Sequence, residues 1–441
     1  MKKWFDEYKA KLCTADEAVQ SISSNDGVYI HSNAAAPQQL IASMTARKSE
    51  LRGVKIYKLI TLGPAPYAEP DCEGSFYVHS MFIGPNIRKA VNEGRADYTP
   101  IFFSELPALF KSRALKVDVC LLSLSIPDDD GYMTLGVSVD STWAALSNCK
   151  YVLAEVNKQM PRTNGDTKIH VSQISKIVET DYALPKLHNE TPDDVAMAIG
   201  RNVSSLVEDG STLQMGIGVI PNAVLQSLHD KRNLGVHTEM FSDAVVNLVQ
   251  SGVINNSRKT VAKGKIAVSF AMGSEKLYDF VDKNPDVEFR GSDWINNSQV
   301  IAENYRMTAI NSALQIDLTG QVCADSLGTH MYSGCGGQVD FVRGASRSEG
   351  GKAIIALEST ARGGTISRLV PTLAPGAGVV TSRADLHYVV TEYGIAQLHG
   401  KNMKDRVRAL IEIAHPQFQA ELERGAHEYG WTGRNFSIAK M

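Results

Sequence analysis

Short apolar runs alternate with segments of helical periodicity along almost the whole chain of 441 residues. Glycine or proline separates most of these segments, which marks the joins as turns. Alternation of buried strands with helices is typical of βαβ units, whose strands form a mainly parallel sheet. The runs rich in Val, Ile and Leu lie at residues 56–62, 117–124, 151–156, 265–270, 353–357 and 386–390. The pattern therefore predicts an α/β fold.

A weak internal repeat relates the two halves of the chain. Residues 26–41 run from Asp-Gly through an apolar segment and a small-residue loop to a proline at an expected helix start. Residues 209–225 follow the same order. A second similarity pairs residues 117–125 with 384–392, because each has an Asp followed by an apolar run. We therefore expect two related α/β domains with mainly parallel open sheets.

The boundary between these domains is expected within residues 157–192, where prolines and an Asn-Gly pair interrupt the pattern. Thr191 is then a candidate N-cap, Pro192 the first helical residue, and two acids follow in the first turn. We accordingly assign residues 1–185 to an N-terminal domain and residues 186–441 to a C-terminal domain.

Composition and charge exclude several classes of protein. The net charge of −3 comes from 45 basic and 48 acidic residues that are mixed along the chain, so no basic tract suggests binding to nucleic acid. The 6 cysteines are scattered and the 11 histidines fit no compact metal-ligand pattern. No apolar run reaches membrane-spanning length, and the first residues lack the apolar core of a signal peptide. We expect a cytoplasmic protein with reduced thiols and without a metal, nucleic-acid or membrane partner.

A glycine-rich turn at residues 214–221 precedes the carboxylate of Glu239 by about twenty residues. In an open parallel sheet the ligand crevice lies beyond the carboxyl ends of the strands, so the turn and Glu239 are expected to share one pocket. A tight strand-to-helix connection and a structural, hydrogen-bonded carboxylate are the plainer interpretations. The same spacing occurs in dinucleotide-binding folds, but Pro221 stands where their third glycine is expected.

Small residues also cluster at 333–341, ahead of an apolar segment that we expect to be a strand. Their successive N–H groups can stabilise a developing negative charge, although a flexible turn has the same composition. Cys335 lies in this cluster, but without an evident histidine partner a role as nucleophile is not favoured. The polar, basic loop at 361–368 either holds a ligand or is solvated.

Several motifs occur in one order along the chain. In chain order they are Met160-Pro-Arg-Thr-x-Gly165, residues 214–221, His237-Thr-Glu239-Met, Asn311-Ser-Ala-Leu-Gln-Ile-Asp317, Gly334-x-Gly-Gly337-Gln-Val-Asp-Phe341 and Thr391-Glu-Tyr-Gly-Ile-Ala-Gln-Leu-His-Gly400. With these motifs the chain resembles the class I CoA-transferases of the acetyl-CoA hydrolase/transferase family. Within that family it is most similar to 4-hydroxybutyrate and butyrate:acetate CoA-transferases.

The resemblance implies two NagB/RpiA-like domains, an active site between them, and a glutamate that carries CoA as a thioester. Transferred to this sequence, that glutamate is Glu239, and Gly337 is expected to direct its amide at the thioester oxygen. The implied CoA-binding residues are Gln214, Met215, Gly216, Ile217, Gly218, Leu314, Gly337 and Gly364. No tightly bound cofactor is implied, since coenzyme A and acyl-CoA are substrates. The usual assembly is a homodimer.

The predicted activity is transfer of CoA between short-chain acids, acetate and 4-hydroxybutyrate or butyrate. Glu239 would form a glutamyl-CoA thioester in a ping-pong mechanism, and residues 32–37 are expected on the acid side of the crevice because of the repeat. An acyl-CoA hydrolase on the same scaffold and a non-catalytic CoA-binding protein are the alternatives.

Overall fold

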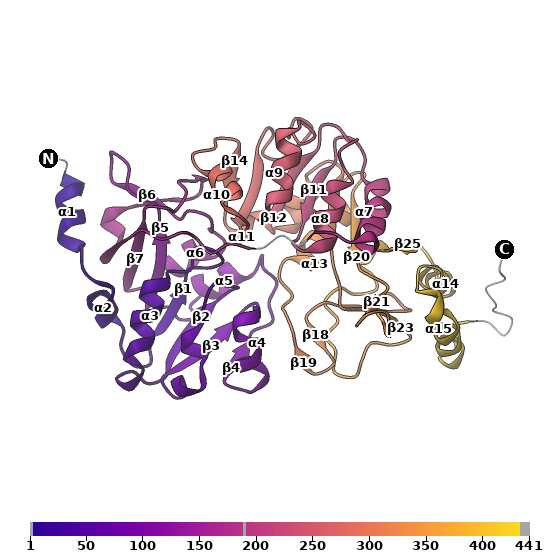
Figure 1. Cartoon of the computed structure of the whole chain (residues 1–441), viewed down its shortest axis with the longest axis horizontal. Helices are drawn as coiled ribbons and strands as arrows, with labels where there is room; N and C mark the ends of the chain where they lie inside the picture. The colour runs from indigo at the N-terminus through magenta and orange to yellow at the C-terminus, as the bar shows by residue number, and fades with distance from the viewer. Residues whose placement is uncertain (1–2, 188–190, 433–441) are drawn as a thin grey trace.

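The computed structural model of the chain describes residues 3–187 and 191–432. Two open sheets flanked by helices stand side by side, the first built by the indigo and purple half of the chain and the second by the later residues (Figure 1). Smaller sheets lie below the second one, and the last helices lie at its outer edge (Figure 1). The predicted α/β fold with mainly parallel sheets is confirmed.

The first sheet has the strand order β10-β7-β5-β1-β2-β3-β4, and every neighbouring pair is parallel. Its strands are β1 (Gly27–Ile30), β2 (Val54–Lys58), β3 (Phe76–Ser80), β4 (Ala96–Tyr98), β5 (Val119–Leu124), β7 (Tyr151–Asn157) and β10 (Lys176–Thr180). The helices of this half are α1 (Lys3–Lys11), α2 (Ala15–Ala18), α3 (Gln38–Ala46), α4 (Pro85–Asn92), α5 (Leu106–Lys111) and α6 (Thr142–Leu146). Short 3₁₀ turns lie at Val19–Ser21, Arg47–Ser49, Pro66–Ala68, Pro70–Cys72 and Val171–Gln173.

The second sheet has the order β25-β24-β20-β15-β11-β12-β13-β14-β8, and β25 alone runs antiparallel to its neighbour. Its strands are β8 (Asn164–Gly165), β11 (Thr212–Met215), β12 (Gly235–Phe241), β13 (Ile266–Ala271), β14 (Val287–Phe289), β15 (Met307–Asn311), β20 (Lys352–Ala356), β24 (Tyr388–Thr391) and β25 (Gly394–Gln397). The helices of this half are α7 (Asp194–Leu206), α8 (Val219–Gln226), α9 (Asp243–Gln250), α10 (Glu275–Val281), α11 (Ser292–Ile295), α12 (Ser298–Ala302), α13 (Gln338–Arg347), α14 (Met403–Glu412) and α15 (Pro416–Glu428).

The remaining strands of the described residues are short and form four small sheets. These are β6 (Tyr132–Thr134) with β9 (Lys168–His170), β16 (Gln315–Asp317) with β17 (Val322–Cys323) and β23 (Leu369–Val370), β18 (Ser326–Leu327) with β19 (His330–Met331), and β21 (Thr360–Ala361) with β22 (Ile366–Ser367). In the described residues no helix combines the length and the apolar character that crossing a membrane requires.

The six runs rich in Val, Ile and Leu each contribute a strand to one of the two large sheets, so these six predictions are confirmed. In β5 all residues are buried, because helices cover both faces of the sheet. Parallel strands buried on both faces are continuous apolar runs, and this is why composition alone located them.

The first similarity of the repeat is confirmed by the structure, and the second is wrong. Strand β1 leads through a short loop to α3 as β11 leads to α8, and both strands lie inside their sheets. However, β5 is hydrogen-bonded to β1, whereas β15 and β20 separate β24 from β11. The strand beside β11 that matches the place of β5 is β15. An Asp before an apolar run describes many buried strands and therefore does not fix a position.

The start of α7 also differs from the prediction. Asp193 is the N-cap, and its side chain accepts a 2.8 Å hydrogen bond from the backbone N–H of Ala196. Thr191 and Pro192 precede the helix, because the carboxylate of Asp193 meets the unpaired N–H groups of its first turn. Strand β8, which precedes the predicted domain boundary, extends the second sheet by pairing with β14. The division at residues 185 and 186 stays a prediction.

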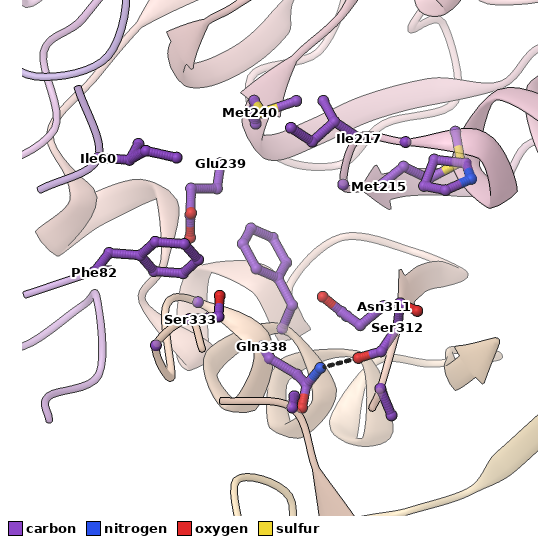
Figure 2. A pocket seen from close by; sticks show the side chains of 18 of the residues that line it. Ile60, Phe82, Met215, Ile217, Glu239, Met240, Asn311, Ser312, Ser333 and Gln338 are labelled. Carbon is purple, nitrogen blue, oxygen red and sulfur yellow. Dashed lines mark hydrogen bonds between the residues drawn. The ribbon is translucent and has the colours of Figure 1, made fainter. Parts of the chain in front are cut away.

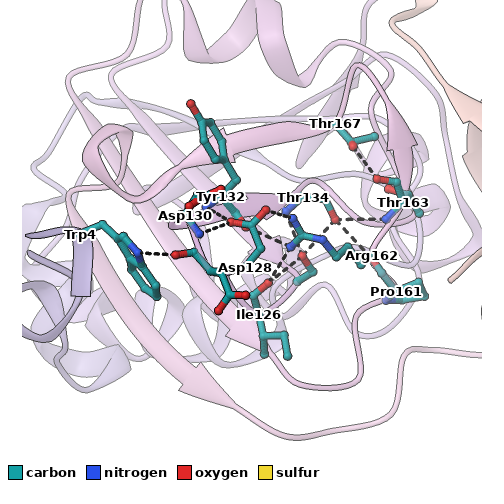
Figure 3. Close-up of polar contacts among 12 residues, drawn as sticks. Trp4, Ile126, Asp128, Asp130, Tyr132, Thr134, Pro161, Arg162, Thr163 and Thr167 are labelled. Atoms are coloured by element: carbon teal, nitrogen blue, oxygen red, sulfur yellow. Dashed lines mark hydrogen bonds and ion pairs between the residues drawn. The ribbon is translucent and has the colours of Figure 1, made fainter. Parts of the chain in front are cut away.

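The motif that begins at Met160 has a structural role in this fold (Figure 3). The guanidinium of Arg162 lies 2.5 Å from Asp128 and donates hydrogen bonds to the carbonyls of Ile126, at 3.2 Å, and Tyr132, at 3.0 Å. Thr163 donates to the carbonyl of Gly136 at 2.7 Å. These contacts hold the hairpin loop at 126–132 to the chain that leads towards the second sheet.

One hydrophobic core cluster contains residues of both halves, and backbone hydrogen bonds also join the halves. The N–H of Val139 donates to Ser269 at 3.0 Å, and the N–H of Ala271 donates to Val137 at 2.8 Å. The rings of Phe103 and Phe270 pack edge to face with centroids 6.3 Å apart. Segment 137–139 of the first half therefore lies against β13 of the second half, and the space between the two sheets has walls from both.

Candidate active site

A cavity of about 720 Å³ lies between the two halves. The first half contributes Asn33, Leu59, Ile60, Phe82 and Phe103 to its walls, and the second half contributes the glycine-rich turn, Glu239 and the loops near Gly337. Figure 2 shows Ile60 and Phe82 on one side of Glu239, and Met215 and Ile217 on the other. A cavity of this volume fits the size range of small-molecule and cofactor sites.

Strand β12 carries Glu239 into this cavity. The strand continues beyond Glu239 through Met240 to Phe241, so the carboxylate belongs to the last residues of the strand and not to the loop after it. Side chains alternate between the faces of a strand, and this places His237 and Glu239 on the same face. On the opposite face, the hydroxyl of Thr238 donates to the carbonyl of Met215 at 3.1 Å and ties β12 to the glycine-rich turn.

The carboxyl group of Glu239 is poorly solvated and close to other acids. Its burial raises its pKa to about 8, and the charges of Asp340 and Asp140 act in the same direction. A hydrogen bond from Asn296, at 2.7 Å from Oε2, and one from the backbone of Gly337 oppose this shift of the pKa. The group is therefore a stronger base than an ordinary carboxylate and has donors directed at its oxygens.

Sequence reasoning missed Asn296. It follows the short helix α11 as its C-cap, and its amide reaches Glu239 only because α11 packs against β12. The ring Nε2 of His237 lies 2.8 Å from the carbonyl of Ile295, and since a carbonyl can only accept, the imidazole donates. Burial lowers the pKa of His237 to about 3, so the ring is neutral and its second nitrogen carries no proton. No local pattern in the sequence announces these contacts.

The predicted glycine-rich turn joins β11 to α8 and lines the cavity. Gly216 and Gly218 have no atom within 4 Å of the position of an added Cβ, and Gly218 has a φ of 108°, which favours glycine. Gln214 and Asn311 exchange side-chain hydrogen bonds of 3.0 and 3.4 Å at the ends of β11 and β15. The space above the turn is open to a ligand, and Gln214, Met215, Gly216, Ile217 and Gly218 all border it.

The predicted residues from the later loops are placed unequally. Gly337 and Leu314 line the cavity together with Glu239. Gly364 lies in the turn between β21 and β22 and is not among the lining residues. The basic loop contributes Arg368 instead, whose guanidinium donates to the carbonyl of Thr360 at 3.1 Å.

The segment after Gly337 is a helix, so the predicted strand is wrong. The helix α13 buries Val339, Phe341, Val342 and Ala345, a spacing that places them on one helical face. Gly337 is its N-cap residue, and an added Cβ there would lie 2.1 Å from Oε2 of Glu239. A side chain at this position would therefore displace the carboxylate.

The turn before α13 is fixed by the first half of the chain. The hydroxyl of Tyr98 accepts the N–H of Cys335 at 2.9 Å, and the N–H of Phe103 donates to Gly336 at 3.1 Å. Asp340 accepts hydrogen bonds from the N–H of Ser104, at 3.1 Å, and from its hydroxyl, at 2.7 Å. These contacts disfavour the interpretation of a flexible turn.

The structure agrees with the interpretation of Cys335 and places one of residues 32–37 at the cavity. Burial raises the pKa of the Cys335 thiol, whose neighbour is the hydroxyl of Tyr98, and this disfavours a thiolate nucleophile. Of residues 32–37 only Asn33 lines the cavity. In the part of the chain that the structure describes, no three His, Cys, Asp or Glu side chains form a group suited to a metal ion.

Two family descriptions match this chain. The acetyl-CoA hydrolase/transferase N-terminal domain matches residues 2–187, and the C-terminal domain of the same family matches residues 273–426. The chain belongs to the acetyl-CoA hydrolase/transferase family. The family assignment agrees with the resemblance drawn from the motifs and with a cavity between two α/β halves.

Curated relatives and a solved structure match this chain along nearly its full length. The 4-hydroxybutyrate coenzyme A transferase of Clostridium kluyveri is 50% identical over 95% of this chain and 98% of its own. The succinyl-CoA:acetate/propanoyl-CoA:succinate CoA transferase of Fasciola hepatica is 46% identical over 94% of this chain and 87% of its own. The crystal structure of 4-hydroxybutyrate CoA-transferase from Porphyromonas gingivalis has a TM-score of 0.84 at 38% identity, covering 97% of this chain and 100% of that one. The expectation of an enzyme of the CoA-transferase type is confirmed by these relatives and by others named for CoA transfer between butyrate and acetate.

Proposed function

We propose that the protein transfers CoA between short-chain carboxylic acids through a covalent intermediate on Glu239. The observation that carries the proposal is the place of this carboxyl group, which lies between the glycine-rich turn on one side and an apolar wall on the other (Figure 2). The turn is the proposed site of CoA, and the wall is the proposed site of the acid. Relatives named for 4-hydroxybutyrate and for butyrate with acetate support acids of this size.

The proposed reaction needs no external activator, because the protein carboxylate stores the thioester energy. Glu239 attacks the carbonyl carbon of the acyl-CoA, the C–S bond breaks, and CoA leaves as the thiolate. The thiolate then attacks the glutamyl carbonyl of the resulting acyl-glutamyl anhydride, which releases the first acid and forms a glutamyl-CoA thioester. The second acid, as a carboxylate, reverses these steps and leaves as its CoA thioester, which gives ping-pong kinetics.

Asn296 and Gly337 are proposed to support each addition step. The amide of Asn296 already contacts Oε2 of Glu239 at 2.7 Å, so it is placed to donate to the oxygen that gains charge when the glutamyl carbonyl is attacked. Gly337 presents its backbone at the same carboxyl group. A well-placed donor to an oxyanion contributes about 3–4 kcal/mol to the stability of a transition state.

The exchange reaction itself tests this proposal. With butyryl-CoA and acetate, the protein is expected to form acetyl-CoA with little release of free thiol, which a thiol reagent reports. Glu239→Gln keeps the size of the side chain but removes the nucleophile, and should lower exchange by at least about 10³-fold. Glu428→Gln, at the end of α15, is the matched control and should keep full activity.

Free thiol release at the rate of butyryl-CoA loss, independent of acetate, would favour the hydrolase alternative instead. Exchange that persists in Glu239→Gln would contradict the assignment of the nucleophile. A homodimeric assembly stays a prediction from the family resemblance, and a cytoplasmic location stays a prediction from the composition of the chain.

A further inference from the structure

The names of the relatives leave the nature of the acid open, since one is named for 4-hydroxybutyrate and another for succinyl-CoA. The side of the cavity formed by the first half, here called the acid wall, consists of Leu59, Ile60, Phe82, Phe103 and Asn33. All but Asn33 are apolar. The acid wall therefore offers hydrocarbon contacts to most of the tail of a bound acid.

Asn33 directs its N–H groups away from the cavity. Its Nδ2 donates to the hydroxyl of Ser138 at 2.9 Å and lies 3.5 Å from the carboxylate of Asp140. Ser138 in turn donates to Asp140 at 2.7 Å, so its oxygen must accept from Asn33. The nearby carboxylate fixes this orientation of the amide, because it would repel the amide oxygen. The one polar side chain of the acid wall thus has no N–H group available for an anion.

Two acids, Asp140 and Asp340, lie close enough to Glu239 to act on its carboxyl group. Asp140 accepts hydrogen bonds from Tyr29, at 3.1 Å, and from Ser138 behind the acid wall. Asp340, in the first turn of α13, accepts hydrogen bonds from Ser104. Both acids raise the pKa of Glu239, which shows that their charge is felt at the reacting carboxyl group.

In the described part of the chain, the acid wall itself contains no cation. Among the described residues that line the cavity, Arg368 is the only Lys or Arg, and it belongs to the second half. Its Nη1 donates to the carbonyl of Ala313 at 3.4 Å, and its charge acts on Glu358. Lys58 precedes the acid wall in sequence but is buried, does not line the cavity, and donates to Asn86 at 3.3 Å.

We propose that the acid wall selects short acids with an uncharged tail and rejects dicarboxylates such as succinate, with Ile60 as a specificity-determining residue. This inference rests on the proposed function. A second carboxylate against this wall would be desolvated without a counter-ion and in the field of two acids, which is strongly unfavourable. A methyl or hydroxymethyl end carries no charge and meets no such penalty.

The test compares butyryl-CoA with succinyl-CoA, whose acyl groups have the same four-carbon chain and differ at the end. With acetate as acceptor, kcat/KM for butyryl-CoA is expected to exceed that for succinyl-CoA by at least about 100-fold. Values within about threefold of each other, or a preference for succinyl-CoA, would overturn the inference and leave the proposed function standing. Turnover of neither thioester would overturn the proposed function itself.

A pair of variants tests the role of charge directly. Ile60→Arg supplies the missing cation and should raise the succinyl-to-butyryl ratio of kcat/KM by at least about tenfold. Ile60→Gln has a polar side chain of similar length without charge and should leave succinyl-CoA disfavoured. Equal ratios in the two variants would contradict selection by charge. Melting curves of the two variants verify that they fold. If a variant fails to fold, the comparison of the two thioesters with the wild-type protein still tests the inference.

Discussion

Glu239 must be ionised to act as a nucleophile, yet its surroundings favour the neutral acid. Burial and the charges of Asp340 and Asp140 raise its pKa to about 8, against the hydrogen bonds from Asn296 and Gly337. A stronger base is also a stronger nucleophile of its kind, so the environment that makes the anion scarce makes it more reactive. The balance of these effects should be visible in the dependence of the rate on pH.

We expect kcat/KM for butyryl-CoA to rise about tenfold per pH unit below pH 7 and to level off above about pH 8. The sign follows because protonation, favoured below the raised pKa of Glu239, removes the nucleophile. Asp340→Asn removes one of the charges that raise this pKa and should move the inflection to lower pH. Asp16→Asn, at an exposed position of helix α2, is the control and should leave the profile unchanged. A rate independent of pH from 6 to 9 would contradict this account of Glu239.

At the scale of elements, α11 links two positions of β12. His237 donates to the carbonyl of Ile295, the last residue of this helix, and the next residue, Asn296, donates to Glu239. The ring of His237 also packs against Trp294 with centroids 5.4 Å apart. His237 therefore acts as a positioning residue, which fixes the end of α11 and with it the amide that faces Glu239.

His237→Ala should lower kcat by about tenfold or more, because a small displacement of the Asn296 amide weakens its support of the transition state. KM for butyryl-CoA should change by less than about twofold, since the side chain does not line the cavity. His237→Gln restores an N–H donor of similar reach and should recover part of kcat. Steady-state kinetics separates the two parameters, and a folded His237→Ala protein with unchanged kcat would show that α11 needs no such anchor.

The sequence predicted elements best where local composition decides structure. The buried strand β5 was evident because parallel strands covered on both faces are continuously apolar. Composition predicts a strand where α13 lies, because apolar residues follow directly after glycines, but the helical spacing of those residues is the signal that matches the structure. Glu239 was found by its spacing from the glycine-rich turn, whereas Asn296 reaches the site only through packing of α11 on β12, which no local pattern encodes.

At the scale of the whole molecule, the position of one half against the other defines the site. Segment 137–139 pairs with β13. The backbone N–H groups of Phe103 and Ser104 donate hydrogen bonds to Gly336 and Asp340. These contacts hold the acid wall opposite the glycine-rich turn and keep the cavity between them. Walls from both halves limit the access of water to Glu239. Water would hydrolyse an anhydride or a thioester and turn a transferase into a hydrolase.

The central claim is that Glu239 carries CoA, and the most direct measurement is mass spectrometry of the intact protein and its peptides. After brief incubation with butyryl-CoA and no acceptor acid, we expect an adduct of the mass of CoA on the peptide that contains Glu239. Acetate should remove the adduct, and Glu239→Gln should never form it. Absence of the adduct under conditions in which the same sample exchanges CoA, or an adduct on another residue, would contradict the account.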